Sequence, residues 1–328
     1  MQIKNKIILI LAVILTALLI WDIYNQLEKK EKVKNGLLSP GIYLGIYKEK
    51  NSIISNLYPL ELGLRKYIEK ENLNVSIYFT SLRNGNNINI NGDKQFYPLS
   101  LSKLPIAILI MRKIEEGKLS LDAMLKIEEE DKIYSYDGLY NTTAKELPVN
   151  ILMEDMLKKS DNTAFKVLSK QIEEEDINRT LDYFSFNLIP YNNWSKPAEE
   201  INTQIMSNML LALYHSTVLK KEDSEYILKL LSESIFDIRE ISSLPEEVKI
   251  AHKWGENNDK GSYHFHDCGI IYLRQARMAY CVMTKDMDRE KAINLISLIM
   301  RSIYEYQESE DSLSEIYKKR DNIGTIEI

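Results

Sequence analysis

The chain has 328 residues, of which 45% are hydrophobic and 27% are charged, so it can bury a sizeable core in one large domain or two smaller ones. The net charge is −6 and no long basic block is present, which argues against a nucleic-acid partner. Two cysteines are too few for a framework of several disulfides.

Residues 7–21, IILILAVILTALLIW, form an uncharged run that follows Lys4 and Lys6. As a helix this run is about 22 Å long, shorter than the ~30 Å hydrocarbon core of a bilayer, but flanking residues extend it. We expect an uncleaved, single-pass membrane anchor with the rest of the chain outside the cell. A cleaved signal peptide and a buried core helix are the alternatives, although no small residues follow the run at a cleavage site.

The elements of the main domain follow in order. The sequence predicts a helix over residues 58–72, a strand at 74–82 rich in β-branched and aromatic residues, and a short second strand after the turn signal RNGNN. From Pro105 the pattern is helical, and helices dominate to about residue 235.

Strand character returns with KIAHKW, DCGIIYLR and RMAYCVMT, and a last amphipathic helix follows. Strands at both ends with helices between them predict an α/β fold of the α+β type. We expect one antiparallel sheet with flanking helices and an inserted all-α lobe. The predicted divisions are an anchor and charged stalk (1–36), a linker (37–54), the main domain (55–308) and a polar tail (309–328).

The stretch YPLSLSKLP places Ser100 and Lys103 three residues apart where a strand-like segment becomes helical. On the first turn of a helix these two side chains share a face, and the helix N-terminus favours developing negative charge. A partly desolvated lysine can then act as the base that a nucleophilic serine needs. Taken alone, the pattern is more typical of a capping serine and a surface lysine.

Two further motifs change that interpretation. KKSDNTAFKVL carries Ser160, Asp161 and Asn162, and IAHKWGENN places Lys253 and Gly255 on a predicted strand. The order Ser-x-x-Lys, Ser-Asp-Asn, Lys-x-Gly resembles the penicillin-recognising serine hydrolases, which include the class A β-lactamases, the transpeptidases and the D-alanyl-D-alanine peptidases. The resemblance runs from about residue 55 to residue 305.

The resemblance implies a role for each matched residue. Ser100 would attack a carbonyl and form an acyl-enzyme, and Lys103 would take its proton. An ammonium at Lys253 would keep Lys103 partly neutral, because like charges disfavour each other. Ser160, positioned by Lys253, would relay a proton to the departing nitrogen.

Other matched residues would bind the substrate. Asn162 would hydrogen-bond the substrate amide, and the backbone N–H groups of Ser100 and Glu256, next to Gly255, would form the oxyanion hole. Asp161 is expected to have a structural task, capping or bracing the lobe. No metal or cofactor is implied.

The sequence departs from the family pattern in two places. Trp254 replaces the usual Thr or Ser of the third motif, whose hydroxyl binds the substrate carboxylate. Its side chain either faces away or fills that space, so anionic substrates would be held less well. The segment from Tyr183 to Ala198 contains no acid, although class A β-lactamases carry there the glutamate that activates the deacylating water. Glu199 and Glu200 follow, but they are typical of a helix start.

Weaker signals concern histidines, cysteines and tyrosines. His252, His264 and His266 are interpreted as strand or rim histidines rather than zinc ligands. Cys268 and Cys281 are expected to face each other across a hairpin as two buried thiols, with a disulfide as the alternative. The tyrosines of YSYDGLY (134–140) either line a binding groove or pack.

Together these features predict a serine hydrolase or acyltransferase anchored in a bacterial cell membrane, with its catalytic domain outside. Its substrates would be peptidoglycan-like peptides or β-lactams. The acyl-enzyme at Ser100 would persist or pass to another acceptor. The alternatives are a true β-lactamase and a catalytically weakened wall-binding or sensor domain.

Overall fold

The computed structural model describes residues 16, 18, 20–28, 31, 36–38 and 57–323, except 83–84, 136–137, 182–200, 260–261 and 274–276. The acid-free segment with Glu199 and Glu200 lies outside these residues, as does most of the predicted anchor over residues 7–21. Of the helices in the described part of the chain, none combines the length and apolar character that crossing a membrane requires.

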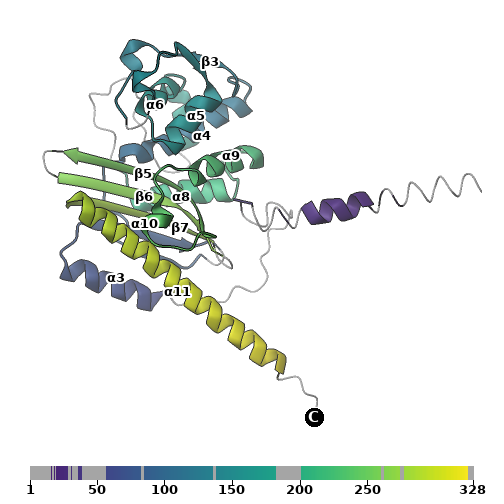
Figure 1. Ribbon diagram of the computed structural model, residues 1–328, viewed down its shortest axis with the longest axis vertical. Coiled ribbons are helices and arrows are strands. Elements are labelled where there is room, and N and C mark those ends of the chain that lie inside the picture. Colours follow the sequence, from purple (N-terminus) through teal and green to yellow (C-terminus); the bar gives the residue numbers. More distant parts are fainter. Residues whose placement is uncertain are drawn as a thin grey trace, which may run out of the picture.

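A five-stranded antiparallel sheet forms the centre of the domain, in the order β2-β1-β7-β6-β5. The first two strands come from one end of the domain and the other three from the opposite end, as the sequence predicts. Helices lie on both faces of the sheet (Figure 1). The strands are β1 (Val75–Ser81), β2 (Asn87–Ile90), β5 (Lys249–Asp259), β6 (Ser262–Tyr272) and β7 (Arg277–Met287).

Alternation along the strands gives the sheet two buried faces. On β1, Val75, Ile77 and Phe79 belong to one core, which α3 (Tyr58–Lys70) and α11 (Arg289–Ile323) cover. Between these residues, Ser76 points to the other face, where its Oγ lies 2.9 Å from Oγ1 of Thr203 on α8 (Thr203–Tyr214). The sheet is therefore covered on both sides, and the helical lobe lies on the second face.

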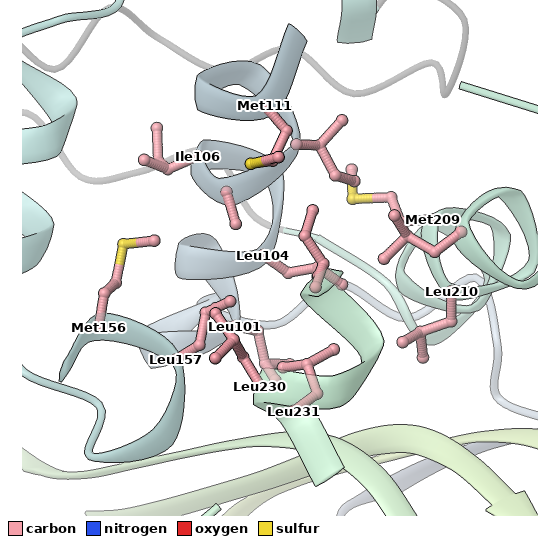
Figure 2. Close-up of a cluster of buried hydrophobic side chains, with 14 of the residues drawn as sticks. Leu101, Leu104, Ile106, Met111, Met156, Leu157, Met209, Leu210, Leu230 and Leu231 are labelled. Atoms are coloured by element: carbon pink, nitrogen blue, oxygen red, sulfur yellow. The ribbon is translucent and has the colours of Figure 1, made fainter. Parts of the chain in front are cut away.

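The helical lobe is built around α4 (Lys103–Glu115), whose residues from Lys103 to Met111 are all buried. Figure 2 shows side chains of neighbouring helices converging on it, such as Met156, Met209 and Leu230. The lobe also contains a small two-stranded sheet, so it is not entirely helical. Its other elements are β3 (Met124–Lys126), β4 (Glu146–Pro148), α5 (Val149–Lys158), α6 (Asn162–Ser169), α7 (Glu174–Leu181) and α9 (Lys221–Ser232). The short helix α10 (Ile238–Ile241) lies instead beside α11, where the Ser297 hydroxyl donates to the Ile241 carbonyl.

Structured residues lie beyond both ends of the predicted main domain. Leu37 and Leu38, assigned to the linker, are buried in the core that the helical lobe shares with the sheet, and the Tyr272 hydroxyl donates to the Leu37 carbonyl at 2.6 Å. Helix α11 continues to Ile323, into the segment predicted as a polar tail.

The prediction of two thiols was wrong. Cys268 of β6 and Cys281 of β7 are directly opposite each other, as expected for a hairpin, and a disulfide joins them. Both side chains are buried on the face that carries the helical lobe. The two residues form a cross-strand pair, and the Cβ atoms of such a pair lie close enough together for a disulfide.

Candidate active site

Ser100 lies in a short 3-10 helix (Leu99–Ser102) that leads directly into α4. Pro105 follows in the first turn of α4, where its missing N–H costs nothing because first-turn N–H groups have no intrahelical partner. Leu99 has a φ of +51°, which is rare for a residue with a side chain. Such strain is concentrated at functional sites, and here it precedes the predicted nucleophile.

Lys103 is fully buried, with 1% of its surface exposed, whereas Ser100 is half-buried and accessible. The Nζ of Lys103 lies 3.0 Å from Oγ of Ser100 and 3.1 Å from Oγ of Ser160. It also donates to the Ser160 carbonyl and to Oδ1 of Asn162, each at 2.7 Å. The structure thus brings the first two predicted motifs together around one amine.

The electrostatics of Lys103 suit a base. All four of its oxygen partners are uncharged, so no carboxylate is bonded to it. Burial lowers the pKa of Lys103 to about 7, and the more distant charge of Asp161 opposes that shift. A neutral amine next to a serine hydroxyl can accept its proton.

The Ser-Asp-Asn motif forms the connection between α5 and α6. Ser160 has a φ of +58°, the second residue with a side chain held in the left-handed region at this site. Asp161 caps α6 by accepting from the Ala164 N–H at 2.6 Å, and its other oxygen accepts from Ser135 and Leu139. Its expected capping and bracing task is therefore what the structure shows.

Asn162 connects the base to the rim of the site. Its Oδ1 holds Lys103, and its Nδ2 donates to the Tyr134 carbonyl at 3.0 Å. The Tyr134 side chain is 70% exposed and packs edge-to-face on Tyr140. The contact to the Tyr134 carbonyl could not be predicted, since a backbone acceptor leaves no mark in the sequence.

Strand β5 approaches Ser100 at Gly255. A Cβ placed on Gly255 would lie 2.7 Å from the backbone nitrogen of Ser100, closer than real Cβ contacts allow. Only glycine lets the strand come this near. Glu256, the predicted second member of the oxyanion hole, follows on the same strand. Its side chain accepts from Arg289 at 3.0 Å and from the Tyr263 hydroxyl.

Lys253 is fully buried on the same strand, but its contacts differ from the prediction. Its Nζ donates to the Trp254 carbonyl at 2.8 Å, while the Ser160 hydroxyl is hydrogen-bonded to Lys103. Burial and, second, the charge of Lys103 lower the pKa of Lys253 well below its usual value, and the Asp267 carboxylate opposes them. The charge of Lys103 therefore disfavours a charge on Lys253, whereas the reverse effect that the resemblance implies stays a prediction.

Trp254 is partly buried and packs against the core that contains Phe265. Its ring centre lies 5.1 Å from that of Phe236 and 6.4 Å from that of Phe265. The side chain therefore faces away from the position of the missing hydroxyl and packs on neighbouring aromatic residues. The site consequently has no hydroxyl at this position of the third motif.

The three clustered histidines have separate partners. His266 donates to the Tyr97 carbonyl at 2.8 Å, His264 contacts Ser262, and His252 pairs with Asp267. Within the described ranges, no group of three or more His, Cys, Asp or Glu side chains could hold a metal ion.

Comparison with known proteins agrees with the fold described above and with the family that the sequence motifs resemble. The family model described as "Beta-lactamase enzyme family" (Beta-lactamase2) matches residues 59–307. The β-lactamase VEB-1 of Pseudomonas aeruginosa is 22% identical over 75% of this chain and 90% of its own length. The solved structure of PBP-A superposes with a TM-score of 0.70 at 18% identity, covering 79% of this chain and all of the other.

A mutant of PBP-A, determined as an acyl-enzyme complex with penicillin G, has a TM-score of 0.69 at 20% identity and covers 77% of this chain and 97% of the other. The solved structures support the antiparallel sheet with its helical lobe, and the family model covers the three motifs around Ser100. The chain therefore belongs to the Beta-lactamase2 family, within the superfamily of class A β-lactamases and penicillin-binding serine hydrolases.

Proposed function

We propose that the protein is a serine acyltransferase or slow hydrolase that forms an acyl-enzyme at Ser100. Its substrates are peptidoglycan-like peptides, and β-lactams enter the same site. The observation that carries this proposal is the contact of a buried, partly neutral Lys103 with the accessible Ser100 hydroxyl at 3.0 Å. The name of the PBP-A complex, an acyl-enzyme with penicillin G, supports a β-lactam as the probe.

Acylation proceeds in steps that the geometry supports. Lys103 takes the Ser100 proton while the oxygen attacks the carbonyl, and the backbone N–H groups of Ser100 and Glu256 stabilise the oxyanion. The Ser160 hydroxyl, 3.1 Å from Nζ of Lys103, passes that proton to the departing nitrogen. The transfers from Ser100 to Lys103 and from Lys103 to Ser160 then each take place over a single hydrogen bond.

Deacylation is the step we propose to be slow. The chain has no Asp or Glu between Tyr183 and Ala198, where class A β-lactamases place the activator of the deacylating water. Without such a base the ester persists until an amine or another acceptor takes the acyl group. Trp254 replaces the residue whose hydroxyl binds a substrate carboxylate. Substrates that carry a carboxylate therefore bind less tightly than they would with that hydroxyl present.

We further propose that the catalytic domain lies outside a bacterial cell, anchored by residues 7–21. The uncharged run in that segment supports an anchor. The disulfide between Cys268 and Cys281 supports an oxidising compartment, because such bonds are rare in the cytosol. Protease protection of the full chain in intact cells tests the orientation.

The acyl-enzyme is tested by intact-mass spectrometry of the full chain in detergent, incubated with a penicillin over hours. We expect a persistent adduct that Ser100→Ala abolishes. An adduct that disappears while the antibiotic is consumed would favour a true β-lactamase. Absence of any adduct would contradict β-lactam recognition and favour a wall-binding domain, whose ligand affinity should survive Ser100→Ala.

A further inference from the structure

His266 links the central sheet to the turn that carries Ser100. This histidine lies on β6 and is completely buried. Its Nε2 donates to the Tyr97 carbonyl at 2.8 Å, and its Nδ1 accepts from the backbone N–H of Thr284 on β7 at 3.3 Å. One side chain therefore joins two backbone segments that come from opposite ends of the domain.

The two contacts define the form of the imidazole ring. A carbonyl oxygen only accepts hydrogen bonds, so Nε2 carries a proton; the Thr284 N–H only donates, so Nδ1 carries none. Burial lowers the pKa of His266 to about 4, which keeps the ring neutral near pH 7. The neutral ring thus offers one donor and one acceptor, each opposite the backbone group that complements it.

An irregular stretch of the sheet turns the Thr284 N–H toward the ring. The pairing of β6 with β7 shifts between Tyr263 and Phe265, next to this contact. There the Thr284 hydroxyl donates to the Phe265 carbonyl at 2.8 Å and accepts from the Phe265 N–H at 3.3 Å. Because the hydroxyl satisfies these backbone groups of β6, the Thr284 N–H is used for His266. The ring is therefore anchored to the sheet by a hydrogen bond as well as by packing.

The partner of His266 on the neighbouring strand contacts the same turn. Gly255 of β5 is paired with His266, and a Cβ on Gly255 would lie 2.7 Å from the Ser100 nitrogen. The pair therefore contacts the turn at both ends, His266 at Tyr97 and Gly255 at Ser100. Leu99, with its φ of +51°, lies between these two contacts. A residue keeps such a conformation only where its surroundings hold it there.

The chain just before the turn is fixed separately. Phe96 and Ile201 exchange two backbone hydrogen bonds, each of 2.8 Å. The Phe96 ring packs edge-to-face on the His266 ring, with the ring centres 5.7 Å apart. Loss of the hydrogen bond from His266 should therefore loosen the turn from Tyr97 to Ser100 and leave the preceding backbone in place.

We propose that His266 is a positioning residue for the reaction at Ser100. Its hydrogen bond to the Tyr97 carbonyl holds the turn in the conformation that presents the Ser100 hydroxyl to Lys103. The inference deepens the proposed function and rests on it for its kinetic consequence. His266 bonds the backbone three residues before the nucleophile, so it acts through the turn and not on the substrate.

The first test follows the backbone and needs no activity. Hydrogen–deuterium exchange of the full chain in detergent is measured by mass spectrometry on peptides that cover residues 96–104. The Leu101 N–H, which donates to the Pro98 carbonyl at 3.0 Å, reports on the turn.

Three variants separate the hydrogen bond from the shape of the ring. His266→Phe keeps a ring and loses both nitrogens, His266→Asn reaches only the position of Nδ1, and His266→Gln places its amide nitrogen near the position of Nε2. We expect exchange in the turn to be about tenfold faster in the Phe and Asn variants and close to wild type in the Gln variant. Unchanged exchange in the Phe and Asn variants would overturn the proposal.

The second test separates the acylation rate constant from the affinity for a penicillin, by measuring adduct formation over a range of penicillin concentrations. We expect the rate constant to fall about 100-fold in the Phe and Asn variants, because a nucleophile displaced by about 1 Å loses that much. The dissociation constant should change by about twofold or less, and His266→Gln should keep the rate constant to within about fivefold. Equal losses in the Gln and Phe variants, or a loss confined to affinity, would contradict the proposal.

The matched control is His264→Phe. His264 lies on the same strand and contacts Ser262 rather than the turn. This variant should leave the exchange of the turn and the acylation rate unchanged, and a loss equal to that of His266→Phe would argue against a specific role for the Tyr97 contact.

The inference and the proposed function fail separately. A wild-type chain that forms no adduct with penicillin contradicts the proposed function, whereas hydrogen exchange still decides whether His266 holds the turn. Near-ultraviolet circular dichroism shows whether each variant folds. Where His266→Phe does not fold, the comparison of His266→Gln with His266→Asn decides, since both carry the same amide and differ in reach.

Discussion

Helix α4 carries a buried lysine near each end, and the two meet opposite kinds of partner. Lys113 bonds the Asp176 carboxylate at 2.9 Å, whereas Lys103 is surrounded by hydroxyl, carbonyl and amide oxygens. A carboxylate satisfies a buried ammonium and makes it a structural cation. Neutral acceptors leave the ammonium penalised by burial, and the pKa of Lys103 falls to about 7. Lys103 thus combines burial with neutral acceptors, whereas Lys113 has a carboxylate partner.

The largest effect should come from Lys103→Met. We expect the rate of Ser100 adduct formation to fall by about 10³-fold, which is typical of removing a general base. Quenched-flow mass spectrometry with a penicillin measures the rate, and Lys113→Met on the same helix is the matched control. A comparable loss in both variants would mean that the two lysines do not differ in function.

Asn162→Asp should make the environment of Lys103 resemble that of Lys113. The new carboxylate would raise the pKa of Lys103 and lower acylation at pH 7 about 10- to 100-fold. The rate should recover as the pH is raised above about 9, since the lysine then loses its proton. Asn162→Ser loses the same amide without adding a charge, and recovery at high pH in that variant too would contradict an electrostatic cause.

The wild-type pH profile provides a test without mutation. Only neutral Lys103 accepts the Ser100 proton, so the acylation rate should rise with pH through about 7. Below that point it should fall about tenfold per pH unit. Rates from pH 5 to 8 measure this limb, and a flat profile over that range would indicate a different base.

The smallest effect on activity should come from Lys113→Met, with a change in acylation of about twofold or less. Its consequence is for stability, because Asp176 is then left nearly buried without its cation. We expect the free energy of unfolding to drop by about 2 kcal/mol in urea titrations. The double variant Lys113→Met/Asp176→Leu should recover part of that loss, and failure to do so would argue that the pair is not what stabilises this end of α4.

The sequence was sufficient for the sheet and the placement of the three motifs. Alternation in VSIYFTS and the apolar run after Pro105 predict β1 and α4, because burial on one or both faces imposes those patterns. The grouping of Ser100, Lys103, Ser160 and Asn162 around one amine agrees with the family resemblance. The catalytic roles of these residues stay predictions until acylation is measured.

Other features depend on contacts that no local pattern contains. Lys253 donates to the carbonyl of its neighbour Trp254 rather than to Ser160. To predict the disulfide, one would have to know that Cys268 and Cys281 are directly paired across β6 and β7. The burial of Asp267 could have been predicted from the sequence, because this carboxylate lies within the apolar strand segment DCGIIY. A buried carboxylate needs hydrogen-bond partners.

The order of the strands also has a consequence for how the chain acquires its structure. Strand β1 is flanked by β2 and by β7, and Val75 pairs with Thr284, so the entire helical lobe lies between the two partners in sequence. A two-stranded ribbon is marginal in water, and pairing across such a separation is slow. The nascent N-terminal half therefore cannot complete its sheet, and we expect the domain to fold only after residues 277–287 have been synthesised.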